Sequence, residues 1–229
     1  MKYLVVVLFL LATGSLSWSE TTVLAPGYGE LQYTPPAPGT YHLPPLGKAA
    51  DGRVLDAAGK SMQLHDVLND KLVLLGFIYT HCPDVNGCPL ASYVMKQVQE
   101  KLVVDPQLRD EVVLISLSFD PELDTPDAMR QYSHHFMRKD FDWRFLTTAS
   151  EADLQPIIDG YGQFRAKYYN PDGSYAGSMS HILRVYLIDR DKRIRNIYSA
   201  GFLHVDTATN DLRTLLMEEQ DMAKLTGRN

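Results

Sequence analysis

Cysteine is scarce in this chain. Only two cysteines, Cys82 and Cys88, occur among its 229 residues. This excludes a small fold held together by several disulfides, and any internal disulfide must join this one local pair. Clusters of basic residues are also missing, because the formal net charge is −6 and no run of Lys or Arg occurs. Phosphate binding needs a clustered cationic surface, so we expect no nucleic-acid partner.

Apolar residues are plentiful enough for one good-sized core. They make up 45% of the chain, against 22% charged residues, a composition typical of a globular protein. Residues 20–47 are different, because prolines interrupt them and few apolar residues recur at regular spacing. We predict that residues 20–47 are a proline-rich tether, or a segment wrapped over the surface, and that residues 48–229 form the folded domain. The prolines in question are Pro26, Pro35, Pro36, Pro38, Pro44 and Pro45.

The N-terminus has the pattern of a secretory signal peptide. Lys2 precedes an uninterrupted apolar run over residues 3–12, and small residues follow around Ser15 to Ser19. We predict that residues 1–19 are a signal peptide and that the protein is exported, to a bacterial periplasm. The alternative is an uncleaved anchor that holds the protein near the membrane, but the uncharged run through Trp18 is shorter than the roughly 20 residues that a spanning helix needs.

Apolar periodicity predicts alternating strands and helices in the folded domain. Continuous apolar runs over residues 72–79 and 112–119 are typical of strands that are buried on both faces. The predicted strands are 52–56 and 60–64, paired as a hairpin, then 72–79, 112–119 and 143–146, and finally 182–188 and 193–198, paired as a second hairpin. The predicted helices begin near Pro89, Thr125, Ser150 and Asp206. This order describes an α/β fold in which helices flank a mixed β-sheet with an N-terminal β-hairpin.

The two cysteines lie where a buried strand passes into a helix. The strand over 72–79 leads to Cys82, and Cys88 stands at the start of the helix that contains Pro89. Unpaired N–H groups and the helix dipole stabilise a thiolate at such a position, and a protonated His81 turned inward would favour the Cys82 thiolate. A purely structural disulfide is the alternative. A disulfide that closes so short a loop would stabilise the fold by well under the roughly 3 kcal/mol expected for a 15-residue loop. Redox or metal chemistry therefore explains the pair better.

Four stretches of the sequence resemble the Sco/SenC family of copper proteins in order and spacing. They are GFIYTHCPDV (76–85), CPL (88–90), SFDPELDTPDAMRQY (118–132) and SHILRVYLIDRD (180–191), and the resemblance covers roughly residues 50–220. It implies a thioredoxin-like fold and a copper ion bound by both loop cysteines and by one histidine just before a late strand. Those positions correspond to Cys82, Cys88 and His181.

The chemistry of this donor set agrees with the resemblance. Two thiolates and an imidazole suit Cu(I) and tolerate Cu(II), and they offer nothing attractive to Mg²⁺ or Ca²⁺. Zinc, with a water as fourth ligand, is the alternative metal. His134 and His135 are neighbours on a predicted helix, where adjacent side chains point in different directions, so we expect them on the surface.

The loop between the cysteines differs from the family pattern. Relatives normally have three residues there, whereas this chain has Pro83 to Gly87, with Asn86 and Gly87 inserted before the second cysteine. We expect the insertion to bulge outward as a tight turn with positive φ angles, which would still let both sulfurs reach one metal.

Two functions of different classes follow from these residues. The first is an exported copper metallochaperone that delivers its metal to a cuproenzyme, which the resemblance identifies as a subunit of cytochrome oxidase. The second is an enzyme, a thiol-disulfide oxidoreductase in which Cys82 and Cys88 are the catalytic pair and no metal is needed. Either requires a thiol reductant protein as a further partner. His181 distinguishes them, because only copper binding depends on it.

Overall fold

The computed structural model describes residues 29, 31 and 33–227. The signal peptide predicted for residues 1–19 therefore lies outside the described residues, as does part of the proline-rich segment. Among the described residues, no helix has both the length and the apolar character needed to cross a membrane.

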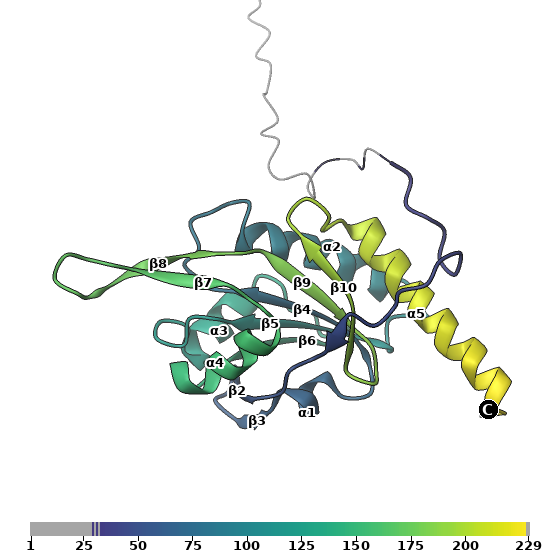
Figure 1. The fold of residues 1–229 in the computed structure, drawn as a ribbon, viewed down its shortest axis with the longest axis horizontal. Helices are drawn as coiled ribbons and strands as arrows, with labels where there is room; N and C mark the ends of the chain where they lie inside the picture. The colour runs from purple at the N-terminus through teal and green to yellow at the C-terminus, as the bar shows by residue number, and fades with distance from the viewer. Residues whose placement is uncertain (1–28, 30, 32, 228–229) are drawn as a thin grey trace, which may run out of the picture.

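An eight-stranded mixed sheet forms the centre of the molecule (Figure 1). Its spatial order is β1-β10-β9-β4-β5-β6-β2-β3. Only the pairs β4–β5 and β5–β6 are parallel, and the other neighbours run antiparallel. The strands are β1 (Gly47–Lys48), β2 (Arg53–Asp56), β3 (Ser61–Gln63), β4 (Leu72–Ile78), β5 (Val112–Ser118), β6 (Trp143–Thr147), β9 (Arg184–Ile188) and β10 (Arg193–Ser199). Both predicted hairpins, β2–β3 and β9–β10, are confirmed.

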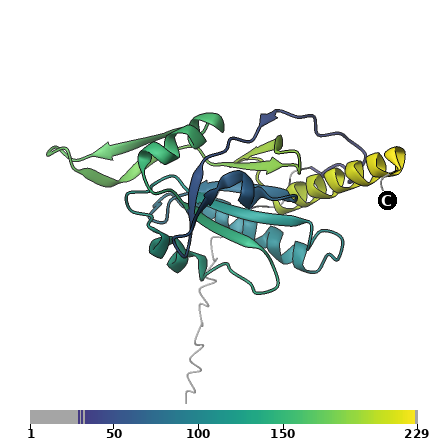
Figure 2. The same ribbon diagram turned by 90° about the horizontal axis from the view of Figure 1, so that it is seen from below.

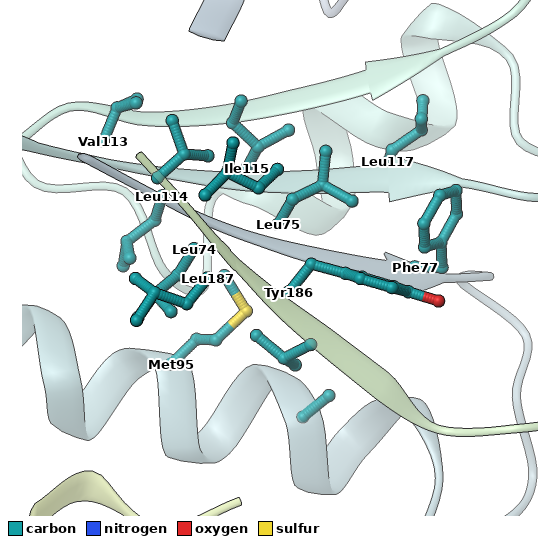
Figure 3. Packing of buried hydrophobic residues seen from close by; sticks show 14 of the residues in the cluster. Leu74, Leu75, Phe77, Met95, Val113, Leu114, Ile115, Leu117, Tyr186 and Leu187 are labelled. Carbon is teal, nitrogen blue, oxygen red and sulfur yellow. The ribbon is translucent and has the colours of Figure 1, made fainter. Parts of the chain in front are cut away.

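The core lies on both faces of the central strands. Every residue of β4 and β5 is buried, as expected for strands whose sequence is continuously apolar. Alternate side chains of β4 point to opposite faces: Leu74 lies on the side of Met95, and Phe77 lies on the other side with Tyr186 (Figure 3). Helices cover the sheet, so the strand ends are the parts of β4 and β5 that can carry a site.

Four of the five helices in the described residues begin close to the predicted positions. They are α2 (Cys88–Val103), α3 (Pro126–Ser133), α4 (Glu151–Gly160) and α5 (Val205–Thr226), and a short α1 (Leu64–Leu68) was not predicted. Thr125 and Ser150 cap α3 and α4, because their side-chain oxygens accept hydrogen bonds from Ala128 N–H and Asp153 N–H. Leu64 was predicted to end the second strand, but it begins α1 instead.

The described part of the proline-rich segment lies against α5. Asn210 donates a hydrogen bond to the Pro36 carbonyl at 3.0 Å, and the Gly39 N–H donates to the Thr214 hydroxyl at 3.1 Å. The Tyr41 hydroxyl bonds to Asp211 at 2.5 Å. This described stretch is therefore a segment wrapped over the surface and not a free tether.

A third hairpin projects from the molecule and was not predicted. It consists of β7 (Arg165–Tyr169) and β8 (Tyr175–His181), which pair with each other in a separate two-stranded sheet. Figures 1 and 2 show it extending away from the main sheet, opposite to the end of α5. His181 is the last residue of β8, so the hairpin carries one of the predicted metal ligands at its base.

Candidate metal centre

The two cysteines lie at the carboxyl end of β4, beside the end of β5. Cys82 follows the strand after Tyr79, Thr80 and His81, and Cys88 is the first residue of α2. The Cys82 side chain is half-buried, whereas Cys88 is only 2% exposed. The Tyr79 N–H donates a hydrogen bond to Cys88 Sγ at 3.4 Å, which ties the second sulfur to the end of the strand.

The enlarged loop between the cysteines folds as a turn closed by Asp84. The Gly87 N–H donates to the Asp84 carbonyl at 2.9 Å, and the Asn86 N–H donates to the Asp84 carboxylate at 3.0 Å. Gly87 has a φ of −96°, and Asn86 is not among the described residues with positive φ. The positive φ angles expected at Asn86 and Gly87 were therefore wrong, because the aspartate side chain forms the turn by bonding its own backbone two residues on.

His181 reaches the cysteines from the hairpin. Its Nε2 atom lies 3.5 Å from Cys88 Sγ and 3.7 Å from Cys82 Sγ. Its other ring nitrogen, Nδ1, lies 3.4 Å from the Met179 carbonyl, an acceptor that leaves Nε2 directed at the sulfurs. The imidazole packs edge-on against Tyr79 and tilted against Phe119, with both ring centroids 5.3 Å away.

The spacing of the three donor atoms suits a single ion. Cys82 Sγ, Cys88 Sγ and the His181 nitrogen lie within 4.8 Å of one another. In zinc sites the bonds from the metal to nitrogen and sulfur ligands are about 2.0–2.3 Å long. Three ligand atoms at such distances around one ion are roughly 3.5–4 Å from one another. The two sulfur–nitrogen distances fall in this range, so the residues fit a three-coordinate soft metal with little rearrangement.

The two thiols differ in acidity. The hydrogen bond from Cys88, followed by the one from His181, lowers the pKa of Cys82 to about 4 against the opposing effect of burial. Burial raises the pKa of Cys88 well above its ordinary value, and the Cys82 thiolate raises it further. The helix start was expected to favour a thiolate at Cys88, but the loss of hydration outweighs the helix at this nearly enclosed sulfur. The structure assigns the thiolate to Cys82.

His181, rather than His81, supports that thiolate. Burial alone would lower the pKa of His181, but its hydrogen bond to Cys82 and the charge there outweigh burial, so the pKa is raised. His81 is exposed, and its Nδ1 lies 2.9 Å from the Thr80 hydroxyl and 3.8 Å from Asp124. His81 is therefore not turned inward, so the condition under which it would favour the Cys82 thiolate is not met. His134 and His135 are exposed, as predicted.

Sequence reasoning missed Gly87 as part of the site. A Cβ atom at Gly87 would lie 3.0 Å from His181 Nε2, 3.2 Å from the Asp84 carbonyl oxygen and 3.3 Å from Cys82 Sγ. The absence of a side chain is what lets the histidine approach the loop so closely. The sequence signal for this role was that Gly87 directly precedes a cysteine at a helix start.

Asp124 supports the residues just before Cys82. Its carboxylate is fully buried and accepts hydrogen bonds from the Thr80 hydroxyl at 2.5 Å, the Thr80 N–H at 3.1 Å and the Ser118 hydroxyl at 2.6 Å. Burial raises the pKa of Asp124, although the hydrogen bonds from Ser118 and Thr80 oppose the rise. Asp124 therefore joins the end of β5 to the cysteine loop.

Comparison with known proteins agrees with this arrangement. The SCO1/SenC family model matches residues 50–217. A SCO2-like protein of Rickettsia conorii is 26% identical over 171 residues, which are 74% of this chain and 75% of that protein.

Solved structures show the same fold. A copper-bound ScoI structure from Bradyrhizobium japonicum superimposes with a TM-score of 0.56 at 29% identity, covering 71% of this chain and 99% of that one. A structure of BsSco, a member of the Sco family of cytochrome c oxidase assembly proteins in which a disulfide switch was identified, gives a TM-score of 0.59 at 23% identity, covering 77% and 98%. The predicted α/β, thioredoxin-like fold is thus confirmed.

Proposed function

The chain belongs to the SCO1/SenC family, and from this premise we propose that it is an exported copper metallochaperone in which Cys82, Cys88 and His181 hold the ion. The observation that carries the proposal is the convergence of three soft donor atoms within 4.8 Å of one another. Copper is the cargo, and binding and release are the function.

The proposed recipient is a copper site of cytochrome oxidase. Support comes from the relatives: one solved relative holds copper, and another belongs to a family of cytochrome c oxidase assembly proteins. Export is supported by the leader-like residues 1–19. An oxidising compartment also explains why a thiol reductant protein is needed as a second partner, since both sulfurs must be reduced before they bind metal.

The geometry suggests how the chain would take up the ion. Cys82 is already a thiolate at neutral pH, so it offers the first anionic ligand. Cys88 carries a proton because it is buried, and this proton must leave when its sulfur becomes a ligand. His181 completes the set through Nε2, while Nδ1 remains bonded to the Met179 carbonyl. Delivery would reverse these steps, with the half-exposed Cys82 as the sulfur that a recipient thiolate can reach.

An anaerobic titration of the reduced protein with Cu(I), in competition with a chromogenic chelator, tests the proposal. His181→Ala should lower the affinity by about tenfold or more, since an imidazole ligand is lost. His135→Ala is the matched control, because that histidine is exposed and does not belong to the group of three donor residues. Equal affinity of the wild type and His181→Ala would refute the three-ligand site.

A thiol-disulfide oxidoreductase is the second candidate, and the asymmetry of the thiols favours it. An accessible sulfur with a lowered pKa beside a buried sulfur with a raised pKa suits attack by the first and resolution by the second. This chemistry should largely survive His181→Ala. Retained exchange activity together with unchanged copper binding in that variant would favour the oxidoreductase.

A further inference from the structure

One acidic turn contacts both halves of the candidate site. The turn, residues 120–124, follows β5 and is closed by the Asp124 N–H, which donates to the Asp120 carbonyl at 2.8 Å. Both aspartate side chains are fully buried. Asp124 accepts the hydrogen bonds from Thr80 that hold the approach to Cys82. Asp120 points instead to the hairpin that carries His181.

The Asp120 carboxylate binds one residue from each strand of that hairpin. Its Oδ2 atom accepts a hydrogen bond from the Tyr175 hydroxyl at 2.8 Å, and its Oδ1 atom lies 3.5 Å from Lys167 Nζ. The ammonium group also lies 4.5 Å from the centre of the Tyr175 ring. The Lys167 side chain is only 10% exposed. Since Asp120 Oδ1 has no hydrogen-bond partner among the described residues, the lysine supplies the compensating charge that a buried carboxylate needs.

Further contacts attach the hairpin to the same turn and to the start of α4. Lys167 also pairs with Glu122 at 2.9 Å and with Glu151 at 2.6 Å. Arg165, which lies opposite His181 in the β7–β8 register, donates to the Phe119 carbonyl at 2.7 Å and pairs with Glu151. The hairpin contributes no strand to the main sheet. Its placement therefore depends on side-chain contacts of this kind.

We infer that the acidic turn 120–124 positions both halves of the site: Asp120 holds the histidine hairpin through Lys167 and Tyr175, and Asp124 holds the cysteine loop through Thr80. These five residues are positioning residues, because the side-chain groups that make these contacts touch none of the metal ligands. For copper affinity the inference rests on the proposed function, whereas for the geometry of the metal-free protein it stands alone.

Nuclear magnetic resonance of the reduced, metal-free protein tests the Asp120 half. The ring currents of Tyr79 and Phe119 displace the signals of the His181 ring protons, because both rings lie 5.3 Å away. Lys167→Met should move these signals at least halfway toward the values of an exposed histidine, and Lys167→Arg should restore them. Lys101→Met is the matched control, since it removes a lysine that pairs with Asp206, away from the hairpin.

Tyr175→Phe provides a milder variant in case Lys167→Met fails to fold. It removes only the hydroxyl group that donates to Asp120 and keeps the ring under the ammonium. The His181 signals should move in the same direction by a smaller amount. Unchanged His181 signals in a folded Lys167→Met protein, or in Tyr175→Phe if the former does not fold, would overturn the inference.

Thiol accessibility tests the Asp124 half. Thr80→Val keeps the side-chain shape but removes the hydroxyl that bonds to Asp124, so alkylation of the buried Cys88 by iodoacetamide should become about tenfold faster through local opening. Thr40→Val is the control, because among the described residues that hydroxyl bonds only to the nearby Ala37 carbonyl. An unchanged alkylation rate in Thr80→Val would show that Asp124 does not hold the loop.

Copper affinity then separates this inference from the proposed function. Lys167→Met should weaken Cu(I) binding by about tenfold, as loss of an outer-shell partner does, and should have no further effect in a His181→Ala background. Displaced His181 signals with unchanged copper affinity would uphold the positioning role and contradict the proposal that His181 is a ligand. An affinity loss of equal size in both backgrounds would contradict the positioning role of Lys167.

Discussion

The cysteine half and the histidine half of the site are built in different ways. Cys82 and Cys88 lie between a fully buried strand and the first turn of a long helix, so core packing holds their backbone together with the hydrogen bonds that Asp124 accepts from Thr80. His181 ends a hairpin that lies outside the main sheet, and ion pairs and a tyrosine hydroxyl hold that hairpin. Apolar packing over a large area tolerates the loss of one contact better than a few buried polar contacts do. The sulfurs thus form the permanent part of the site and the imidazole its adjustable part.

Removal of a sulfur should have the largest effect and tests the difference between the two halves most directly. In Cys88→Ser the hydroxyl is a poor ligand for a soft metal, so Cu(I) affinity should fall by more than about 100-fold, beyond the range for outer-shell changes. Competition with a chelator measures the loss. Ser92→Ala, which removes a buried hydroxyl from the same helix, should bind copper normally. If His181→Ala weakened binding more than Cys88→Ser, the ranking of the two halves would be reversed.

The difference between the halves also explains what the sequence could predict. The runs over 72–79 and 112–119 have a strong apolar pattern because β4 and β5 are buried on both faces. They predicted the central strands, and with Pro89 they placed both cysteines at a strand–helix junction. The β7–β8 hairpin buries few of its residues, so it has no apolar pattern to detect. Only Asp172-Gly173 between its tyrosines indicated a turn.

The position of His181 could not be derived from local sequence. It lies 93 residues after Cys88, and only the family resemblance connected the two. The roles of Asp120 and Asp124 were missed for a related reason, because aspartates in a turn ordinarily bond their own backbone. Here both side chains are buried and bind groups 55 and 44 residues away. Such long-range polar partners depend on the tertiary fold.

An added methyl group at Gly87 tests which half moves, since it lies where the two halves meet. The Cβ of Gly87→Ala would lie 3.0 Å from His181 Nε2 and 3.2 Å from the Asp84 carbonyl. Gly87 directly precedes α2, which carries Cys88, so we expect the histidine to move rather than the backbone, and Cu(I) affinity to fall by about tenfold, roughly 1.4 kcal/mol. Gly47→Ala is the control, because no atom lies within 4 Å of its added Cβ. Displaced thiols with an unmoved His181 in a crystal structure of Gly87→Ala would identify the cysteine half as the adjustable one.

The pH dependence of Cys82 alkylation should show the smallest change. A thiol of ordinary pKa near 8.5 would react roughly 75-fold faster at pH 8 than at pH 6, following its thiolate fraction. The hydrogen bond from Cys88 and then that from His181 lower the pKa of Cys82 to about 4. A group with so low a pKa is a thiolate throughout this interval, so its reaction rate with iodoacetamide should be nearly constant from pH 6 to pH 8. Mass spectrometry of the modified peptides separates Cys82 from the slowly reacting Cys88.

Two variants assign the cause of this constant rate. Cys88→Ala removes the hydrogen bond that contributes most to the low pKa of Cys82, so the rate should again increase with pH. Cys88→Ser keeps a hydroxyl donor at the same position, so the rate should stay nearly constant even though copper binding is lost. His181→Ala should give a slope between those of wild type and Cys88→Ala, because its hydrogen bond is the smaller of the two. A steeper slope in His181→Ala than in Cys88→Ala would mean that the hairpin, rather than the partner cysteine, controls the reactive sulfur.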